Sequence, residues 1–151
     1  MIINTHNVKE TIQLAENISK YLKKGDVLCL TGDLGTGKTH FSKGIAKGLK
    51  VDENITSPTF TIVNEYRSGI LPLFHFDVYR VNDTNEILDI GFDEYIYGDG
   101  VTLIEWANLI EEILPDNFLH IKIEKTDHEN ERKFTLTPFG MGYDYIKDVE
   151  I

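Results

Sequence analysis

The spacing of apolar and polar residues predicts the elements in the first third of the chain. A helix is expected over residues 8–22, because its apolar residues recur at helical intervals and would face inward: Val8, Ile12, Ala15, Ile18 and Leu22. The run DVLCLT, residues 26–31, is short and apolar, which is typical of a buried strand. A second helix over 38–50 follows from an apolar stripe at every fourth position: Phe41, Ile45 and Leu49. Gly44 and Gly48 lower the helix propensity there, but they allow close packing on a sheet.

The rest of the chain alternates between β-rich and weakly helical stretches. Two β-rich runs, residues 59–67 and 71–80, are separated by three residues, which predicts an antiparallel hairpin. After them the pattern predicts a weak helix, a buried strand, a short helix and two further strands: 84–90, 101–106, 107–114, 118–125 and 132–138. A terminal helix would complete the count.

The stretch between the first strand and the second helix is GDLGTGKTH, which matches G-x-x-x-x-G-K-[ST] without a mismatch. The pattern is carried by Gly32, Gly37, Lys38 and Thr39. Glycines let successive backbone N–H groups turn toward phosphate oxygens, the lysine reaches the β- and γ-phosphates, and the threonine hydroxyl ligates Mg²⁺. The order strand, loop, helix also aims a helix N-terminus at an anion. A phosphate-binding loop is therefore predicted over a turn without a ligand.

These elements together predict an α/β fold. We expect one three-layer, P-loop NTPase-like domain over residues 1–151, with a mixed sheet that has a parallel core and antiparallel side strands. The length of 151 residues suffices for a core, and 41% hydrophobic and 26% charged residues are typical of a soluble globule. No internal repeat or linker suggests a second domain.

The cysteine content and the N-terminal sequence bear on location. The single cysteine, Cys29, lies inside the apolar strand before the loop and is expected to be a small buried hydrophobe, with no disulfide or metal site implied. The start of the chain has no signal-peptide pattern, and no apolar run is long enough to cross a bilayer. We expect a cytoplasmic protein with no membrane contact.

The net charge of −10 is concentrated in one window. Residues 81–121 contain no lysine or arginine and ten acids: Asp83, Glu86, Asp89, Asp93, Glu94, Asp99, Glu105, Glu111, Glu112 and Asp116. Such a surface repels phosphate backbones, so no strong direct binding of nucleic acid is expected. Lys43, Lys47 and Lys50 could form a small basic stripe, although a solvated helix face explains them better.

Two acids, Asp77 and Glu105, each follow an apolar strand. Ligands gather at the carboxyl ends of strands in open α/β sheets, so both are candidates for Mg²⁺ binding and hydrolysis. Each alone could also be a strand-end charge in solvent. Which of them holds Mg²⁺ and which orients the attacking water stays open.

Three further residues near these strand ends each allow two interpretations. Trp106 could stack near a nucleotide or fill the core, and its chemistry favours the core. His75 alternates with apolar neighbours and is expected to be a half-buried hydrogen-bonding residue. Arg80, one of only three arginines, is placed to reach a phosphate but could equally lie on the surface.

Four blocks occur in order along residues 32–107: GDLGTGKTHFSKG, TSPTFTIVNEY, HFDVYR and LIEWA. Together they resemble the TsaE family, also called YjeE, of small bacterial P-loop ATPases required for threonylcarbamoyladenosine synthesis on tRNA. The last three blocks at this spacing are specific, whereas beyond residue 115 only the general character matches.

The resemblance implies a role for each matching position. ATP would be bound by the loop and its neighbours: Gly32, Asp33, Leu34, Gly35, Thr36, Gly37, Lys38, Thr39, His40, Thr59 and Trp106. Thr39 and Glu105 would lie on the Mg²⁺ side, and Asp77 would be the other acid needed for hydrolysis and would also be available to the metal, with Lys38 assisting catalysis. Residues 56–61 would form a switch-like loop near the γ-phosphate. His40 stands where many members carry threonine or another small residue, which puts little in doubt.

The resemblance also implies partners and a pathway. Family members act with the TsaD and TsaB proteins, and the modification lies at position 37 of ANN-decoding tRNAs. Two rival classes remain, a small-molecule kinase and a nucleotide-dependent switch or binding module. A kinase lid usually needs several arginines, and the guanine-reading N-K-x-D signature is absent, since KKGD at residues 23–26 lacks the asparagine and precedes the loop.

Overall fold

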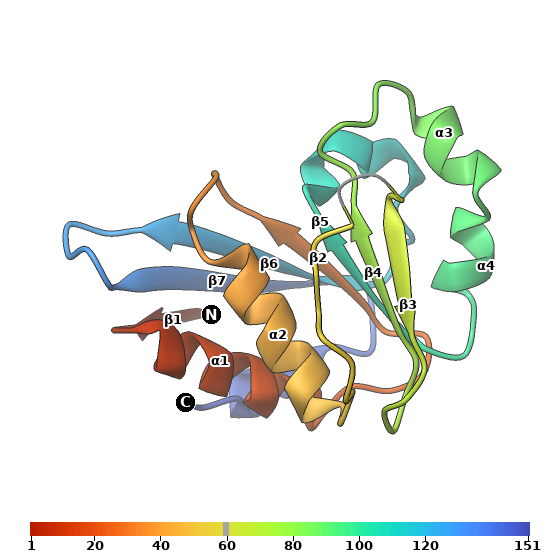
Figure 1. Cartoon of the computed structure of the whole chain (residues 1–151). Coiled ribbons are helices and arrows are strands. Elements are labelled where there is room, and N and C mark those ends of the chain that lie inside the picture. The colour runs from red at the N-terminus through yellow and green to blue at the C-terminus, as the bar shows by residue number, and fades with distance from the viewer. Residues whose placement is uncertain (59–60) are drawn as a thin grey trace.

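One mixed sheet organises the part of the chain that this computed structural model describes, residues 1–58 and 61–151 (Figure 1). Within those residues the sheet has seven strands in the order β1-β7-β6-β2-β5-β4-β3. The strands are β1 (Ile2–Thr5), β2 (Val27–Thr31), β3 (Val63–Tyr66), β4 (Leu73–Asp77), β5 (Val101–Glu105), β6 (Phe118–Lys125) and β7 (Arg132–Phe139). The domain boundaries 1–151 stay a prediction.

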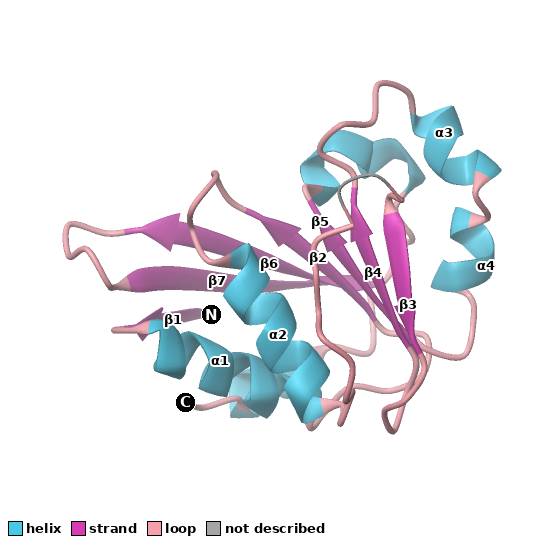
Figure 2. Cartoon of the chain, viewed as in Figure 1, coloured by secondary structure: helices cyan, strands magenta, loops and turns pink. Residues whose placement is uncertain are grey.

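The pairing of the strands confirms the predicted parallel core and antiparallel sides. β2 pairs in parallel with β5 and β6, and β5 pairs in parallel with β4. The pairs β1–β7, β6–β7 and β3–β4 are antiparallel (Figure 2). The predicted hairpin is therefore present, but its first strand begins at Val63; the predicted start at residue 59 lies outside the described residues.

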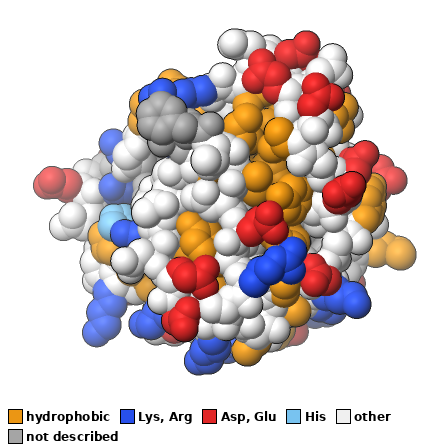
Figure 3. All heavy atoms as spheres, turned by 45° about the vertical axis from the view of Figure 1, so that its right-hand side comes forward, with side chains coloured by type: hydrophobic (Ala, Val, Ile, Leu, Met, Phe, Trp, Pro, Cys, Tyr) orange, Lys and Arg blue, Asp and Glu red, His pale blue; other side chains and the backbone are white. Residues whose placement is uncertain are grey.

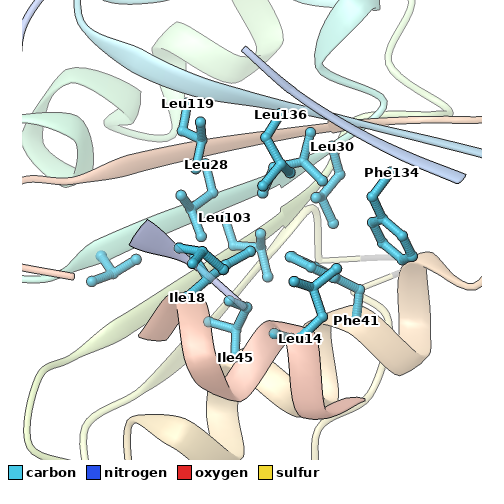
Figure 4. Packing of buried hydrophobic residues seen from close by; sticks show 14 of the residues in the cluster. Leu14, Ile18, Leu28, Leu30, Phe41, Ile45, Leu103, Leu119, Phe134 and Leu136 are labelled. Carbon is cyan, nitrogen blue, oxygen red and sulfur yellow. The ribbon is translucent and has the colours of Figure 1, made fainter. Parts of the chain in front are cut away.

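Helices on both faces of the sheet complete the three layers. One face carries α1 (Val8–Ser19), α2 (Lys38–Gly48) and the terminal 3₁₀-helix η2 (Asp144–Asp148), and the other carries α3 (Thr84–Asp89), α4 (Phe92–Ile96) and the 3₁₀-helix η1 (Ala107–Ile113). Strand residues alternate between the two cores, so that Leu28 and Leu30 face α1 and α2, whereas Cys29 faces η1. Figure 4 shows Leu14 and Ile18 of α1 meeting Phe41 and Ile45 of α2 under the sheet.

The inward stripe predicted for the first helix is partly wrong. Ala15 and Ile18 are buried, but Val8 is exposed because it lies in the first turn, directly after the Asn7 cap. The Asn7 side chain accepts a hydrogen bond from the Glu10 amide at 2.8 Å, which satisfies one of the free N–H groups of that turn. The helix also ends at Ser19, three residues before the predicted end.

The two glycines of α2 face α1 rather than a sheet, which corrects the prediction. A Cβ at Gly44 would lie 2.6 Å from both the Ala15 Cβ and the Ile12 carbonyl oxygen, and a Cβ at Gly48 would meet Ser19 even more closely. The Ser19 hydroxyl crosses the same contact, donating to the Ile45 carbonyl at 3.2 Å. The glycines therefore let the backbone of α2 approach the small side chains and the backbone of α1.

Two short elements, β1 and α4, were missed by the sequence pattern. β1 has four residues and α4 has five, which is too short for a periodic signal. The predicted helix over 107–114 is a 3₁₀-helix with a kink at Ile110. Cys29 is buried as predicted, and burial raises the pKa of its thiol. Among the described residues, no helix is long and apolar enough to cross a membrane.

Candidate active site

The predicted phosphate loop joins the end of β2 directly to the start of α2. Gly35 and Gly37 have φ angles of 78° and 106°, a region that other residues avoid. Gly32 passes so close to β6 that a Cβ there would lie 2.6 Å from the Ile123 carbonyl oxygen. The Thr36 hydroxyl donates to the Asp33 carbonyl at 2.9 Å and closes the turn. The loop thus presents the N-terminus of α2, an eleven-residue helix, at its open side.

Lys38 lies across the mouth of this loop. Its ammonium donates to the carbonyls of Gly32 and Asp33 at 2.6 and 2.8 Å, and it sits 4.4 Å from the centre of the Trp106 ring. Burial lowers the pKa of the Lys38 ammonium, and the nearby carboxylates of Glu105 and Asp77 oppose that shift. A cation held by dipoles and a ring can turn toward an anion without a large change of position.

Asp77 and Glu105 end neighbouring parallel strands and are partners in the sheet register. They therefore emerge at the edge of the sheet where the phosphate loop lies. Asp77 is partly buried, and its Oδ1 accepts a hydrogen bond from the Tyr79 amide at 3.1 Å. Burial raises the pKa of Asp77, and the Glu105 charge adds to that shift. Glu105 is only 3% exposed, which is rare for a charged side chain without a partner.

The partner of Glu105 is His75, a residue of β4. His75 Nε2 lies 2.7 Å from Glu105 Oε2, and both side chains are buried. Sequence alternation predicted a half-buried histidine, but His75 is 1% exposed; it lies on β4, which is flanked by β5 and β3 in the sheet. Its hydrogen-bonding role is as predicted.

Trp106 follows β5 in a left-handed conformation, with a φ of 62°. Its ring packs on Tyr79 at 4.6 Å between centroids and faces Lys38, so it lies beside the loop and only partly in the core. Ser57 of the predicted switch-like loop reaches the same place. Thr59, predicted to contact the nucleotide, lies outside the described residues.

These side chains line a cavity of about 360 Å³. Its wall includes predicted residues, namely Leu34, Gly35, Thr36, Gly37, Lys38, Thr39, His40, Asp77, Glu105 and Trp106, and residues not predicted, namely Asn7, Val8, Thr11, Asn130 and Arg132. Arg80 is exposed. A larger hollow of about 1300 Å³ lies on the other side of the loop, against η1 and β6. We assign the site to the smaller cavity, because Lys38, Thr39 and both carboxylates converge there and not in the larger one.

Arg132 contacts the phosphate loop, which sequence reasoning did not predict. Its Nε donates to the Thr36 carbonyl at 3.0 Å and its Nη2 to the Gly35 carbonyl at 3.4 Å. The guanidinium therefore ties the start of β7 to the outside of the phosphate loop. Its position just after an acidic and polar turn gave no local signal, because the contact spans 96 residues of sequence.

The donor set fits Mg²⁺ bound together with phosphate oxygens. In the described part of the chain, no group of three His, Cys, Asp or Glu residues could hold a metal alone. Mg²⁺, however, is typically held by one or two carboxylates plus substrate phosphates. The Thr39 hydroxyl and the carboxylates of Glu105 and Asp77 are oxygen ligands of that kind.

A glycine loop between a parallel strand and a helix, with its lysine, its threonine and two strand-end carboxylates, is the arrangement that defines the P-loop class of proteins. Residues 5–134 match the family model described as "Threonylcarbamoyl adenosine biosynthesis protein TsaE". The chain belongs to the TsaE family.

Relatives and a solved structure agree with that assignment. The tRNA threonylcarbamoyladenosine biosynthesis protein TsaE of Bacillus subtilis is 49% identical over 142 residues, which cover 94% of this chain and 88% of the relative. The protein of the same name from Treponema pallidum is 40% identical, covering 79% and 87% of the two chains. A crystal structure of Bacillus subtilis YdiB superimposes with a TM-score of 0.82 at 44% identity, covering 98% of this chain and 91% of that one.

Proposed function

We propose that this chain binds ATP with Mg²⁺ at the phosphate loop and hydrolyses it, as the ATPase component of tRNA threonylcarbamoyladenosine biosynthesis. The role in that biosynthesis is the one stated by the family description and by the names of the curated relatives. The observation that carries the ATPase proposal is the convergence of Lys38, Thr39, Asp77 and Glu105 on one cavity at the N-terminus of α2.

Each part of the site has a role in this proposal. The backbone N–H groups of the loop and the Lys38 ammonium bind the phosphates. Thr39 and Glu105 would hold Mg²⁺, which when bound would neutralise charge developing on the transferred phosphoryl group. Asp77, half-buried and fixed by the Tyr79 amide, is available to orient the attacking water or to assist at the metal. Asn7 and Asn130 also line the cavity, and their side-chain amides are available to hydrogen-bond a nucleotide base.

The acidic side of the molecule supports protein partners rather than tRNA as direct contacts. Nine of the ten acids of the 81–121 window are exposed, the exception being Glu105. Figure 3 shows acidic side chains along the top and right of one face, where α3 and α4 lie; basic side chains lie mainly at the left and lower edges, with some beside acids right of centre. We propose that this surface meets the TsaD and TsaB proteins in the cytoplasm and that the chain binds free tRNA only weakly.

The test of the ATPase proposal is the variant Lys38→Ala, compared with Lys43→Ala, an exposed lysine on the same helix. Loss of a charge-assisted contact to phosphate should weaken MgATP binding roughly 10- to 100-fold and abolish turnover, while Lys43→Ala behaves as wild type. Turnover is measured alone and with TsaD and TsaB present. Unchanged affinity and turnover in Lys38→Ala would contradict the phosphate-loop assignment.

Partner binding is tested by pull-down with TsaD and TsaB, with and without ATP, beside filter binding of tRNA. The expected result is ATP-sensitive capture of the proteins and weak retention of tRNA. Tight binding to tRNA alone, without ATP-sensitive capture of the proteins, would contradict the proposed partners.

A further inference from the structure

His75 is a buried residue with a defined relation to the site but no place in the cavity wall. It belongs to β4, two residues before Asp77, and on a strand that spacing puts both side chains on the same face. In the register of the sheet it lies opposite Leu103, so Glu105 is its diagonal neighbour on β5. The diagonal contact is the 2.7 Å approach of His75 Nε2 to Glu105 Oε2.

We propose that His75 is a positioning residue for Glu105. It holds one carboxylate oxygen in the interior and thereby presents the other to the cavity beside the phosphate loop. This inference rests on the proposed function, because the orientation of Glu105 matters only if that carboxylate acts on bound MgATP. His75 itself touches neither nucleotide nor metal in this scheme.

The need for such a partner follows from the surroundings of Glu105. A glutamate side chain rotates about three bonds, and a buried carboxylate without a hydrogen bond is strongly disfavoured. Asp77 stands opposite it in the register and repels its charge. Without His75, the Glu105 carboxylate would lower its energy by turning toward Lys38 or solvent. In either orientation it would no longer be held in one position as a metal ligand.

The hydrogen bonds around His75 indicate which tautomer of the imidazole holds Glu105. His75 Nδ1 is buried and has no hydrogen-bond partner. An N–H at Nδ1 would be an unsatisfied buried donor, whereas an N–H at Nε2 is satisfied by Glu105. The proton is therefore assigned to Nε2, and His75 donates to the carboxylate. The neighbouring acid is held differently, by the backbone amide of Tyr79, so only Glu105 depends on a side chain for its orientation.

Three variants separate this role from simple packing. His75→Leu keeps the volume and removes the donor, and His75→Gln restores a side-chain N–H near the Nε2 position. Leu73→Val, on the same strand and face but fully buried two residues earlier, is the matched packing control. For each variant, kcat and KM for MgATP, the Mg²⁺ concentration for half-maximal turnover, and the free energy of unfolding are measured.

For His75→Leu we expect a fall in kcat of roughly ten-fold, a several-fold higher Mg²⁺ requirement, and a KM for ATP within about two-fold of wild type. His75→Gln should recover most of kcat, and Leu73→Val should lose stability without this kinetic pattern. In a Glu105→Gln background, His75→Leu should change kcat by less than about two-fold, because the residue through which it acts is already altered. Equal losses in both backgrounds, or a kcat for His75→Leu that equals that of Leu73→Val, would overturn the proposal.

A second measurement is independent of turnover. In ¹⁵N-labelled protein, the His75 imidazole should show a slowly exchanging proton on Nε2, and Glu105→Gln should shift that signal. Absence of the proton, or a spectrum unaffected by Glu105→Gln, contradicts the assigned contact. The wild-type chain could hydrolyse no ATP even with its partners while this signal behaves as expected. The ATPase proposal and the positioning role of His75 would then both be wrong, and the contact between His75 and Glu105 would be purely structural.

Discussion

The two halves of the sheet use polar side chains in different ways. In the parallel half, β2, β5 and β4 all end at one edge, and that edge carries the phosphate loop, Glu105 and Asp77. In the antiparallel flank, β7 runs against β6 and β1, so the carboxyl ends are divided between opposite edges. The flank contributes Arg132 to the loop, and it does so through backbone carbonyls of the loop.

Strand direction therefore determines where catalytic side chains can come together. Parallel strands bring several residues, distant in sequence, to a common edge, whereas antiparallel strands spread theirs. The parallel half accepts buried charge at that edge, and the flank has a core of apolar residues such as Phe134 and Leu136. Changes in the apolar core of the flank should therefore alter stability, and changes to the strand-end acids of the parallel half should alter turnover.

The largest expected effect is on the flank side. Phe134→Ala removes a fully buried ring that packs against Phe41, and it should lower the free energy of unfolding by about 3–5 kcal/mol. Turnover per folded molecule should stay close to wild type. Chemical denaturation measures the first quantity, and ATPase assays corrected for the folded fraction measure the second. Phe139→Ala, 44% exposed on the same strand, is the control. A selective loss of turnover in Phe134→Ala would show that the core of the flank also serves the site.

On the parallel side, Asp77→Ala and Glu105→Ala should each reduce hydrolysis by roughly 100-fold, the scale of losing a metal ligand or a positioned base. ATP affinity should change much less, because Lys38 and the loop still bind the phosphates. Single-turnover hydrolysis and equilibrium binding distinguish the two effects. Asp89→Ala, an exposed acid on α3, should behave as wild type. Normal hydrolysis in both site variants would show that the metal-site interpretation is wrong.

Trp106 reports on the parallel half without mutation. It is the single tryptophan of the chain, it lines the cavity, and the Lys38 ammonium lies 4.4 Å from its ring centre. Nucleotide binding should draw that ammonium toward phosphate and change the surroundings of the ring, so its emission should change on addition of MgATP. A titration that leaves the spectrum unaltered would return Trp106 to a purely packing role.

The smallest expected effect is on the free energy of unfolding, which the buried carboxylate of Asp77 lowers at neutral pH. The pKa of Asp77 is raised above its ordinary value of 3.8, chiefly by burial, so its ionised form is disfavoured in the folded state. A raised pKa contributes stability below the unfolded value, and this contribution is lost as the pH rises through the folded value. Asp77→Asn should therefore be more stable than wild type at about pH 7, with the difference vanishing near pH 3. Asp89→Asn supplies the control, and a gain that persists at low pH contradicts this origin.

The sequence was sufficient for the parts of the molecule whose signals are local. The phosphate loop is a contiguous pattern, and Asp77 and Glu105 could be placed because each ends an apolar run. Their meeting was not predicted, because it depends on β4 and β5 being parallel neighbours in the sheet.

Long-range contacts and short elements explain what could not be predicted. The Arg132 contact with Thr36 and the burial of His75 against Glu105 depend on which strands become neighbours. β1 has too few residues to show a period, and it is a strand because β7 offers it an edge. The faces of Gly44 and Gly48 were misassigned because periodicity says where a helix is apolar and not what covers it.

The glycine contact between α1 and α2 makes distant positions mechanically part of the site. α2 begins with Lys38 and Thr39, and at Gly44 and Gly48 its backbone packs closely against α1, including the small side chains of Ala15 and Ser19. A methyl group at either glycine would push α2 away from α1 and displace the N-terminal end of α2, which carries Lys38 and Thr39. In a saturation scan, these two positions should therefore be as intolerant as the loop itself, although neither faces the cavity.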